Sequence, residues 1–217
     1  PDGAIYVSDW HDQRTAHPDP DADWDRSNGR IFRIVYEKPE SVNRDATESV
    51  DFAKLSRQEL LELHQHKNQW WVRRARAELI RRHPLPGASD NPGDQLAQEL
   101  LVRATAGASE VAALEAFWTL ASLDLIDEET TIKLLDSPHA AVRAWNIRSL
   151  GDRRAISEHL AHILDRFAEQ ESSVRVRQQL ASTAKRLPAK YAVPLINANI
   201  IRDVDNGDPY LPLLWWW

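Results

Sequence analysis

Short helical segments follow one another from Ser56 to the end of the chain, and this succession constrains the fold more than any other feature. In the first segment, Ser56 and Glu59 have the spacing of a capping box. The apolar stripe of the same segment consists of Leu60, Leu61 and Leu63. Nine further segments of this kind can be separated, each ended by a brief turn. The sequence therefore predicts a mainly α region over this part of the chain.

The segments also repeat. Three of them open on a Val-Arg pair, namely Val72-Arg73, Val142-Arg143 and Val174-Arg175. A fourth aligns through Val111 and a fifth loosely near Tyr210, so the successive spacings are 39, 31, 32 and about 36 residues. Paired helices with a period of this size are typical of an α-solenoid, in which stacking buries the faces that one pair leaves exposed. We expect a HEAT-like α-solenoid of about five helical pairs, with the four valines at equivalent depths.

The first 36 residues follow a different pattern. GAIYVSDW (3–10) and GRIFRIVY (29–36) are rich in β-forming residues, and an acidic loop joins them. Two strands are not stable alone, so we expect them to belong to a larger sheet. Residues 37–55 are polar, lack a clear period and are predicted to be a linker before the helical repeats of 56–217. The chain has no Met and ends on PLLWWW, so we expect a piece of a longer protein, truncated at the C-terminus.

The acidic loop raises the question of a metal site. Asp19, Asp21 and Asp23 match the opening of a calcium loop, but Trp24 and Arg30 stand where an EF-hand needs Gly and Glu. An EF-hand is therefore excluded. The candidates for another cation site are Asp9, His11, Asp12, His17, Asp19, Asp21 and Asp23.

A structural interpretation of the loop is favoured over a metal site. Its Asp side chains would cap turns and pair with Arg14, Arg26 and Arg30, while Trp10 and Trp24 would hold it against the sheet. No confident metal ligand follows from the sequence alone.

Charge and composition limit the partners. The formal charge of −6 argues against bulk attraction to nucleic acid, although residues 67–82 are locally basic. We expect Arg73, Arg143 and Arg175 to bond carboxylates and turn carbonyls between repeats, with Asp136 and Glu171 nearby. No nucleic-acid partner and no membrane span are expected. The absence of Cys excludes disulfides and a CxxCH haem attachment within these residues.

Aromatic and histidine residues at helical spacing usually have structural roles. The aromatic residues are predicted to belong to the core, namely Trp70, Trp71, Trp118 and Trp145. His159 and His162 lie one helical turn apart and are predicted to lie on a solvated surface. Trp215, Trp216 and Trp217 are expected to begin a helix. The sequence holds no Ser-His-Asp order, Gly-rich phosphate loop or HExxH, so catalytic and cofactor-binding residues are unknown.

Three stretches resemble one family. DGAIYVSDWHDQRTAHPDPDADWDRSNGRIFRI (2–34) resembles the closing segment of the sugar-dehydrogenase-like β-propeller in PVC-type membrane-bound dehydrogenases. KLSRQELLELHQHKNQWWVRRARAELIRR (54–82) resembles the start of their HEAT-repeat region, and DNGDPYLPLLWWW (205–217) a segment inside it. The resemblance implies that residues 1–36 are the terminal strands of a propeller blade, with the acidic loop as the excursion between them.

The resemblance also implies a function for the longer protein. Such proteins join a propeller, a HEAT array and a c-type cytochrome domain, and act as quinoprotein or sorbosone/glucose dehydrogenase-like oxidoreductases. They are exported to the periplasm and membrane-associated. A quinone of the PQQ type with calcium would lie upstream of this chain and haem c downstream, so no cofactor is expected within it. The chain itself is then a scaffold that docks the propeller, the cytochrome domain or a protein partner. The alternatives are a stand-alone HEAT-repeat interaction module without catalysis and a nucleic-acid-binding HEAT-like protein.

Overall fold

The computed structural model describes residues 4–8, 29–34, 50–83, 93–107 and 109–216. It divides the chain into two compact units, Pro1–Asp51 and Phe52–Trp217. The greater part of the expected linker lies outside the described residues.

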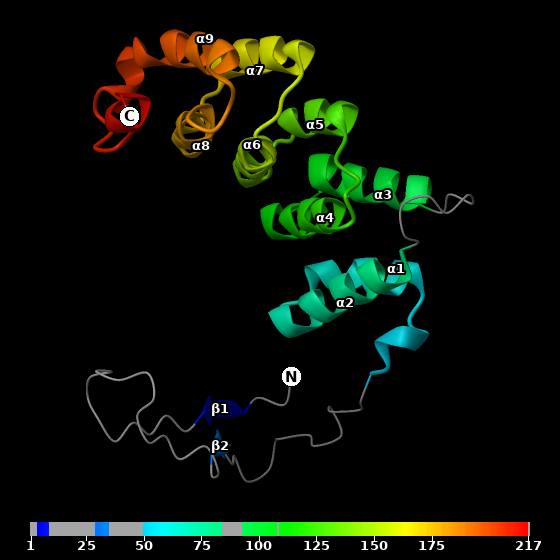
Figure 1. The fold of residues 1–217 in the computed structure, drawn as a ribbon. Coiled ribbons are helices and arrows are strands. Elements are labelled where there is room, and N and C mark those ends of the chain that lie inside the picture. Colours follow the sequence, from blue (N-terminus) through cyan, green and yellow to red (C-terminus); the bar gives the residue numbers. More distant parts are fainter. Residues whose placement is uncertain (1–3, 9–28, 35–49, 84–92, 108, 217) are drawn as a thin grey trace, which may run out of the picture. The chain divides into compact units, whose positions relative to one another are not determined.

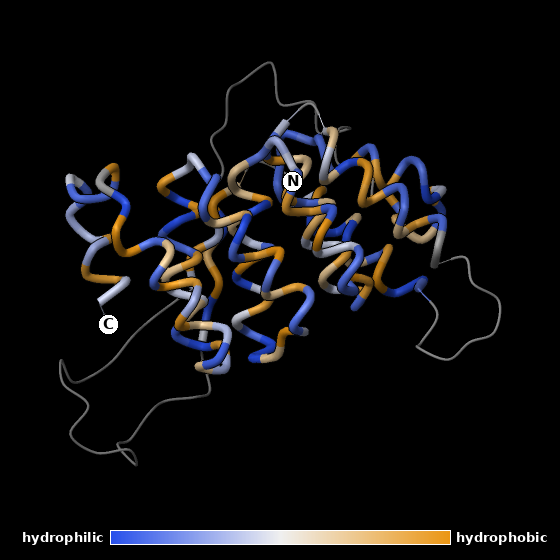
Figure 2. Tube along the Cα trace, turned by 90° about the horizontal axis from the view of Figure 1, so that it is seen from above, coloured by the Kyte–Doolittle hydropathy of each residue, from blue (hydrophilic) through white to orange (hydrophobic). Residues whose placement is uncertain are grey.

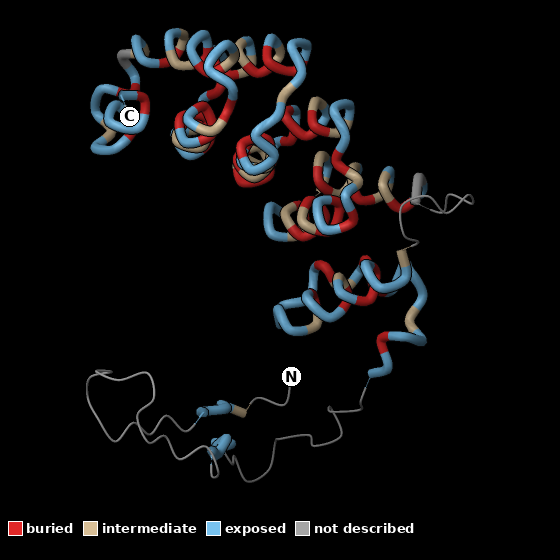
Figure 3. Tube along the Cα trace, viewed as in Figure 1, coloured by how far each residue is buried: buried red, intermediate tan, exposed pale blue. Residues whose placement is uncertain are grey.

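The first unit contains an antiparallel two-stranded sheet. Strand β1 (Ile5–Ser8) pairs with β2 (Ile31–Ile34), with Ile5 opposite Ile34 and Ser8 opposite Ile31. All eight strand residues are exposed (Figure 3). The predicted pairing of these two stretches is confirmed, whereas their membership in a propeller blade stays a prediction.

The second unit is helical, as the sequence predicts. Its described residues form α1 (Arg57–Glu62), α2 (Gln69–Arg82), α3 (Gly93–Ala106), α4 (Glu110–Ser122), α5 (Glu128–Leu135), α6 (Ala140–Arg153), α7 (Glu158–Gln170), α8 (Val174–Ala184), α9 (Ala189–Ile200) and α10 (Leu211–Trp216). Short 3-10 turns also occur, namely η2 (Phe52–Lys54), η3 (Leu63–Gln65) and η4 (Asp203–Asp205). Within these residues every helix is too short or too polar to cross a bilayer.

Side-chain caps explain where several helices begin. The predicted capping box is present, since the Ser56 hydroxyl accepts from the Glu59 amide and the Glu59 carboxylate accepts from the Ser56 amide. Ser109, Asp127 and Ser157 cap α4, α5 and α7 in the same way through their side-chain oxygens. Each cap satisfies one backbone N–H that the first helical turn leaves without a partner.

The helices of this unit pack in two rows (Figure 1). In one row α3 contacts α5, α5 contacts α7 and α7 contacts α9; we call this row A. In the other, α2 contacts α4, α4 contacts α6, α6 contacts α8 and α8 contacts α10; we call this row B. Contacts between the rows include α3 with α4, α5 with α6 and α8 with α9, while α1 lies against α2. From α2 on, each helix therefore contacts the helices two positions away in the chain, and most of them also contact one or both sequence neighbours.

Apolar side chains fill the space between the helices. Figure 2 shows apolar and polar stretches alternating along the helical tubes, and Figure 3 shows buried stretches recurring in the helices of both rows. The buried residues form two clusters, one centred on Phe117, Leu100 and Leu120 and the other on Ile147 and Leu180. The α5–α6 pair contributes to both clusters, so it joins the two parts of the core.

The sequence alignment of the valines is wrong. Val72 and Val142 are fully buried, but Val111 is 56% and Val174 is 42% exposed. In α8 the buried valine is Val176, two residues later. The helices do stack side by side, but the equivalent positions differ from those that the Val-Arg pairs suggested.

The predicted tryptophan core is confirmed in part, because Trp71, Trp118 and Trp145 pack against the buried cluster around Phe117 while Trp70 does not belong to the core. Trp70 is exposed, and the rings of Trp71, Trp118 and Trp145 are only half-buried. Trp215 is buried, but Trp215 and Trp216 end helix α10 and do not begin a helix as expected, while Trp217 lies outside the described residues.

Candidate functional site

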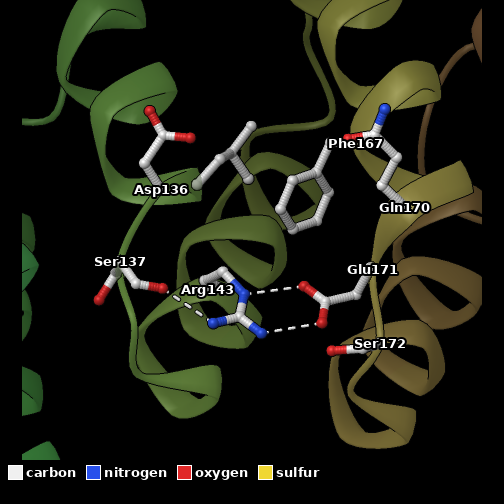
Figure 4. Close-up of a pocket in the computed structure, with 8 residues that line it drawn as sticks. Asp136, Ser137, Arg143, Phe167, Gln170, Glu171 and Ser172 are labelled. Atoms are coloured by element: carbon white, nitrogen blue, oxygen red, sulfur yellow. Dashed lines mark hydrogen bonds and ion pairs between the residues drawn. The ribbon is translucent and has the colours of Figure 1, made fainter.

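Arg143 lies at the junction between successive helical pairs. Its Nε and Nη2 atoms donate to the two carboxylate oxygens of Glu171, each at 2.8 Å, and Nη1 donates to the Ser137 carbonyl at 2.8 Å (Figure 4). Glu171 is buried and also accepts from the Ser173 amide at 2.7 Å. Burial alone would raise the pKa of Glu171, but these hydrogen bonds outweigh it and hold the pKa below its usual value. The prediction that Arg143 bonds a carboxylate and a turn carbonyl is therefore confirmed, but its carboxylate is Glu171 and not the nearby Asp136.

A second arginine repeats this arrangement, but not the one that we expected. Arg177 is buried, donates to the carbonyls of Glu171 and Ser172, and pairs with the buried carboxylate of Asp205. Arg175, which was expected here, is exposed and lies 3.7 Å from Glu110 on α4. The carboxylate follows its arginine by 28 residues in both cases, and this shared spacing is the signal in the sequence that identifies the pair.

A further arginine position also recurs at the ends of two row B helices. Arg82 donates to the Leu55 carbonyl and Arg153 to the Ile126 carbonyl, 27 residues back in both cases. Leu55 and Ile126 stand just before the N-cap residues of α1 and α5. These bonds fasten the end of one helix to the beginning of the helix before it.

A cleft of about 280 Å³ opens beside Arg143 (Figure 4). Its lining includes Asp136, Phe167 and Gln170, in addition to the Arg143–Glu171 pair. The Ser137 hydroxyl donates to the Ala104 carbonyl at 2.8 Å, so no base activates it. The Arg143–Glu171 pair is already saturated by the contacts above. The lining therefore holds the repeats together and does not form a catalytic constellation.

The metal candidates receive no support. Asp9, His11, Asp12, His17, Asp19, Asp21 and Asp23 lie outside the described residues. Within the described ranges, no group of three or more His, Asp or Glu residues could hold a metal ion. His159 and His162 are both exposed on α7, on the solvated surface where the sequence placed them.

His64 is the most unusual titratable residue of the described part of the chain. It is only 2% exposed, and neither ring nitrogen has a hydrogen-bond partner there. Burial, followed by the charges of Arg103 and Arg76, lowers the pKa of His64 to about 4. The imidazole is therefore neutral near pH 7. Its ring packs in the interior. It also lines a small cavity of about 50 Å³, together with Arg103 and Ser109.

A continuous row of arginine and tryptophan side chains runs across row B. The guanidinium of Arg76 on α2 lies 5.8 Å from the ring centre of Trp118 on α4. Trp118 packs edge-to-face on Trp145 of α6 at 5.5 Å, and Arg148 lies 4.9 Å from the Trp145 ring. Arg148 and Arg186 then share the carboxylate of Asp152. We call Arg76, Trp118, Trp145, Arg148, Asp152 and Arg186 the Arg–Trp row.

The N-terminal end of this surface carries more cations. Arg73 and Arg74 of α2 are exposed, and Arg74 lies within 6 Å of the ring centres of both Phe52 and Trp70. In the described residues no carboxylate lies within ion-pair distance of Arg73 or Arg74. Arg76, by contrast, pairs with the buried Glu115 at 2.7 Å. Burial raises the pKa of Glu115, although Arg76 and Arg73 favour its charged form.

The two rows differ in charge. The row B helices contain ten arginines and four carboxylates, whereas row A contains four basic and seven acidic residues. Each row B carboxylate already has an arginine partner, namely Glu78 with Arg81 and Arg82, Glu110 with Arg175, Glu115 with Arg76, and Asp152 with Arg148 and Arg186. Two further arginines, Arg143 and Arg177, pair with Glu171 and Asp205 outside these helices, so a smaller surplus of positive charge remains on row B.

Comparison with known proteins adds no assignment. Neither the scan against protein-family models nor the searches of curated proteins and of solved structures found a match to this chain.

Proposed function

We propose that the helical unit is a HEAT-like α-solenoid whose row B side binds another protein surface. The two-row packing of its helices supports this proposal, because from α2 on each helix contacts the helices two positions away in the chain, as stacked pairs do. The recurring arginine contacts support it as well. Those at 28 residues join one helical pair to the next, and those at 27 residues join the two helices of one pair.

The observation that carries the docking role is the Arg–Trp row. Tryptophan and arginine are the residues most enriched in the energetically dominant parts of protein interfaces. Here they form one contiguous set of contacts across α2, α4 and α6 to the end of α8, in which the rings, Arg76 and Arg186 are half-buried and Arg148 is exposed.

Site-specific photo-crosslinking tests the docking role. Benzoylphenylalanine is placed at Ser122 or Ser182 on row B, and at Glu129 or His162 on row A as matched exposed controls. We expect row B labels to capture a defined protein from the source organism. That protein is then identified by mass spectrometry, purified and titrated against the chain, where Arg148→Glu should weaken binding and Arg166→Glu on α7 should not. Equal capture by both rows, or no effect of Arg148→Glu, would contradict the proposal.

We also propose that the longer protein is a dehydrogenase-like redox protein of the PVC type, exported and membrane-associated. Its support is the resemblance of residues 2–34, 54–82 and 205–217 to that family. The quinone with calcium and the haem c would then be held by parts of the protein outside this chain. The sequence of the complete open reading frame tests this proposal. Propeller blades upstream and a CxxCH motif downstream are expected. An open reading frame with neither would reject the dehydrogenase proposal and favour the stand-alone interaction module.

A further inference from the structure

We infer that the partner reaches row B through an acidic segment in extended conformation, which lies along the Arg–Trp row and the neighbouring Arg73 and Arg74. This inference rests on the proposed docking function and names the chemistry of the partner.

Charge complementarity selects an acidic partner. Arg73 and Arg74 face no carboxylate within ion-pair distance in the described residues, and Arg148 and Arg186 share a single one, Asp152. About three positive charges on this side thus lack a matching negative charge. Carboxylates of a partner would supply those negative charges. Arg148 is about half exposed, so its guanidinium is accessible.

The aromatic rings prepare these cations for binding. Arg74 and Arg148 rest against the rings of Trp70 and Trp145, so their long side chains are already restricted. A restricted side chain loses less entropy when it binds a carboxylate. The half-buried ring of Trp118 between them offers an apolar contact for the residues that separate the partner's acidic groups.

The spacing of the helices fits an extended chain. Neighbouring packed helices lie about 8–10 Å apart, and an extended chain advances about 3.3 Å per residue. Carboxylates about three residues apart therefore match successive row B helices. A segment of about ten residues would extend from α2 to α8.

A protein segment fits this side better than a nucleic acid. Asp152 and the exposed Glu110 lie among the cations and would repel an unbroken line of phosphates. A peptide can place uncharged residues opposite these two carboxylates. The cations that remain are too few for the phosphate contacts that a nucleic acid normally uses.

Fluorescence anisotropy with a defined probe tests the inference. The probe is a fluorescein-labelled peptide, Asp-Ser-Gly repeated three times and closed by Asp, titrated with the full chain at low salt; the same peptide with Asn for Asp is its control. We expect the Asp peptide to bind at least tenfold more tightly than the Asn peptide. Arg74→Gln and Arg148→Gln should each weaken binding about threefold and together about tenfold, as expected for exposed ion pairs. Arg166→Gln on α7 should leave binding unchanged.

Three outcomes would overturn the inference: equal binding of the Asp and Asn peptides, no effect of Arg74→Gln and Arg148→Gln, or tighter binding of a 20-nucleotide single-stranded DNA than of the Asp peptide. The photo-crosslinking experiment separates this inference from the docking proposal. Capture at Ser122 and Ser182 without binding of the Asp peptide would retain docking and reject the acidic segment. Peptide binding without capture would point to an acidic ligand but reject the proposed protein partner.

Discussion

At the scale of single residues, the buried polar groups fall into two kinds. Glu171 and Asp205 are buried with an arginine and several hydrogen bonds each, so their charges are compensated. His64 is buried with no hydrogen-bond partner in the described residues and is therefore neutral. A buried carboxylate is stable only while its arginine partner is present, and buried His64 is stable only while its imidazole stays unprotonated.

Removing the Glu171 charge should destabilise the fold. Glu171→Gln leaves the Arg143 guanidinium half-buried without its carboxylate, and we expect a loss of about 3 kcal/mol in the free energy of unfolding. Urea denaturation followed by circular dichroism measures it. The control is Glu129→Gln, which breaks the exposed pair with Lys133 and should cost less than about 1 kcal/mol. Equal losses in the two variants would show that the Arg143–Glu171 pair is not structural.

His64 should make stability depend on pH in a defined window. The unfolded chain binds the His64 proton near pH 6.5, its ordinary pKa, whereas the folded chain binds it only near pH 4. The free energy of unfolding should therefore fall as the pH is lowered from 6.5 towards 4, by up to about 3 kcal/mol.

His64→Leu isolates this effect. The variant should lack the loss of stability between pH 6.5 and pH 4 in urea titrations at several pH values. The lowered pKa values of Glu78 and Glu171 act in a different window, because their contribution is lost only as the pH falls below their ordinary value of 4.5. An unchanged pH slope above 4.5 in His64→Leu would assign the slope to another group.

At the scale of helices, the number and order of the elements follow from local chemistry, but the faces that they bury do not. All ten expected helices are present, because Ser, Asp and apolar spacing mark them locally. The segment VRVR contains two Val-Arg pairs, Val174-Arg175 and Val176-Arg177, and both fit a helix equally well. Only packing against α6 and α9 selects the second pair as the buried one.

The tryptophans show the same limit. Local pattern makes Trp118 and Trp145 look like core residues, and they do pack against the buried cluster around Phe117, but neither is fully buried. Arg76 pairs with Glu115, which lies 39 residues later, so no short sequence motif predicts this ion pair. By contrast, the bond from Arg143 to a turn carbonyl could be predicted, because a turn stands just before its helix, whereas its carboxylate partner lies 28 residues later.

The choice between the two valines of α8 can be measured directly. Val176→Ala should lower the free energy of unfolding by about 2 kcal/mol, because it empties fully buried apolar space. Val174→Ala, two residues earlier in the same helix, should change it by less than about 0.5 kcal/mol. Thermal or urea unfolding of the two variants gives both values. The reverse order would restore the alignment by the first Val-Arg pair.

At the scale of the whole helical unit, the proposed docking surface depends on a linear order of the helices. Contacts connect each helix to near neighbours in the chain, as is typical of repeat proteins in which stability is the sum of pair and junction terms. The Arg–Trp row exists as a continuous surface only if α2, α4, α6 and α8 stand side by side in that order. A compact bundle of the same ten helices would bring α2 and α8 together and divide the surface.

The distance between α2 and α8 therefore tests this linear order of the row B helices. The chain has no native Cys, so Ala77→Cys and Ser182→Cys, both on exposed row B positions, can be spin-labelled without interference. Three helix-to-helix steps of about 10 Å predict a pulsed electron–electron distance of about 25–35 Å. A narrow distribution in that range is the expected result. A distribution centred below about 20 Å would contradict the stacked order and, with it, the docking surface.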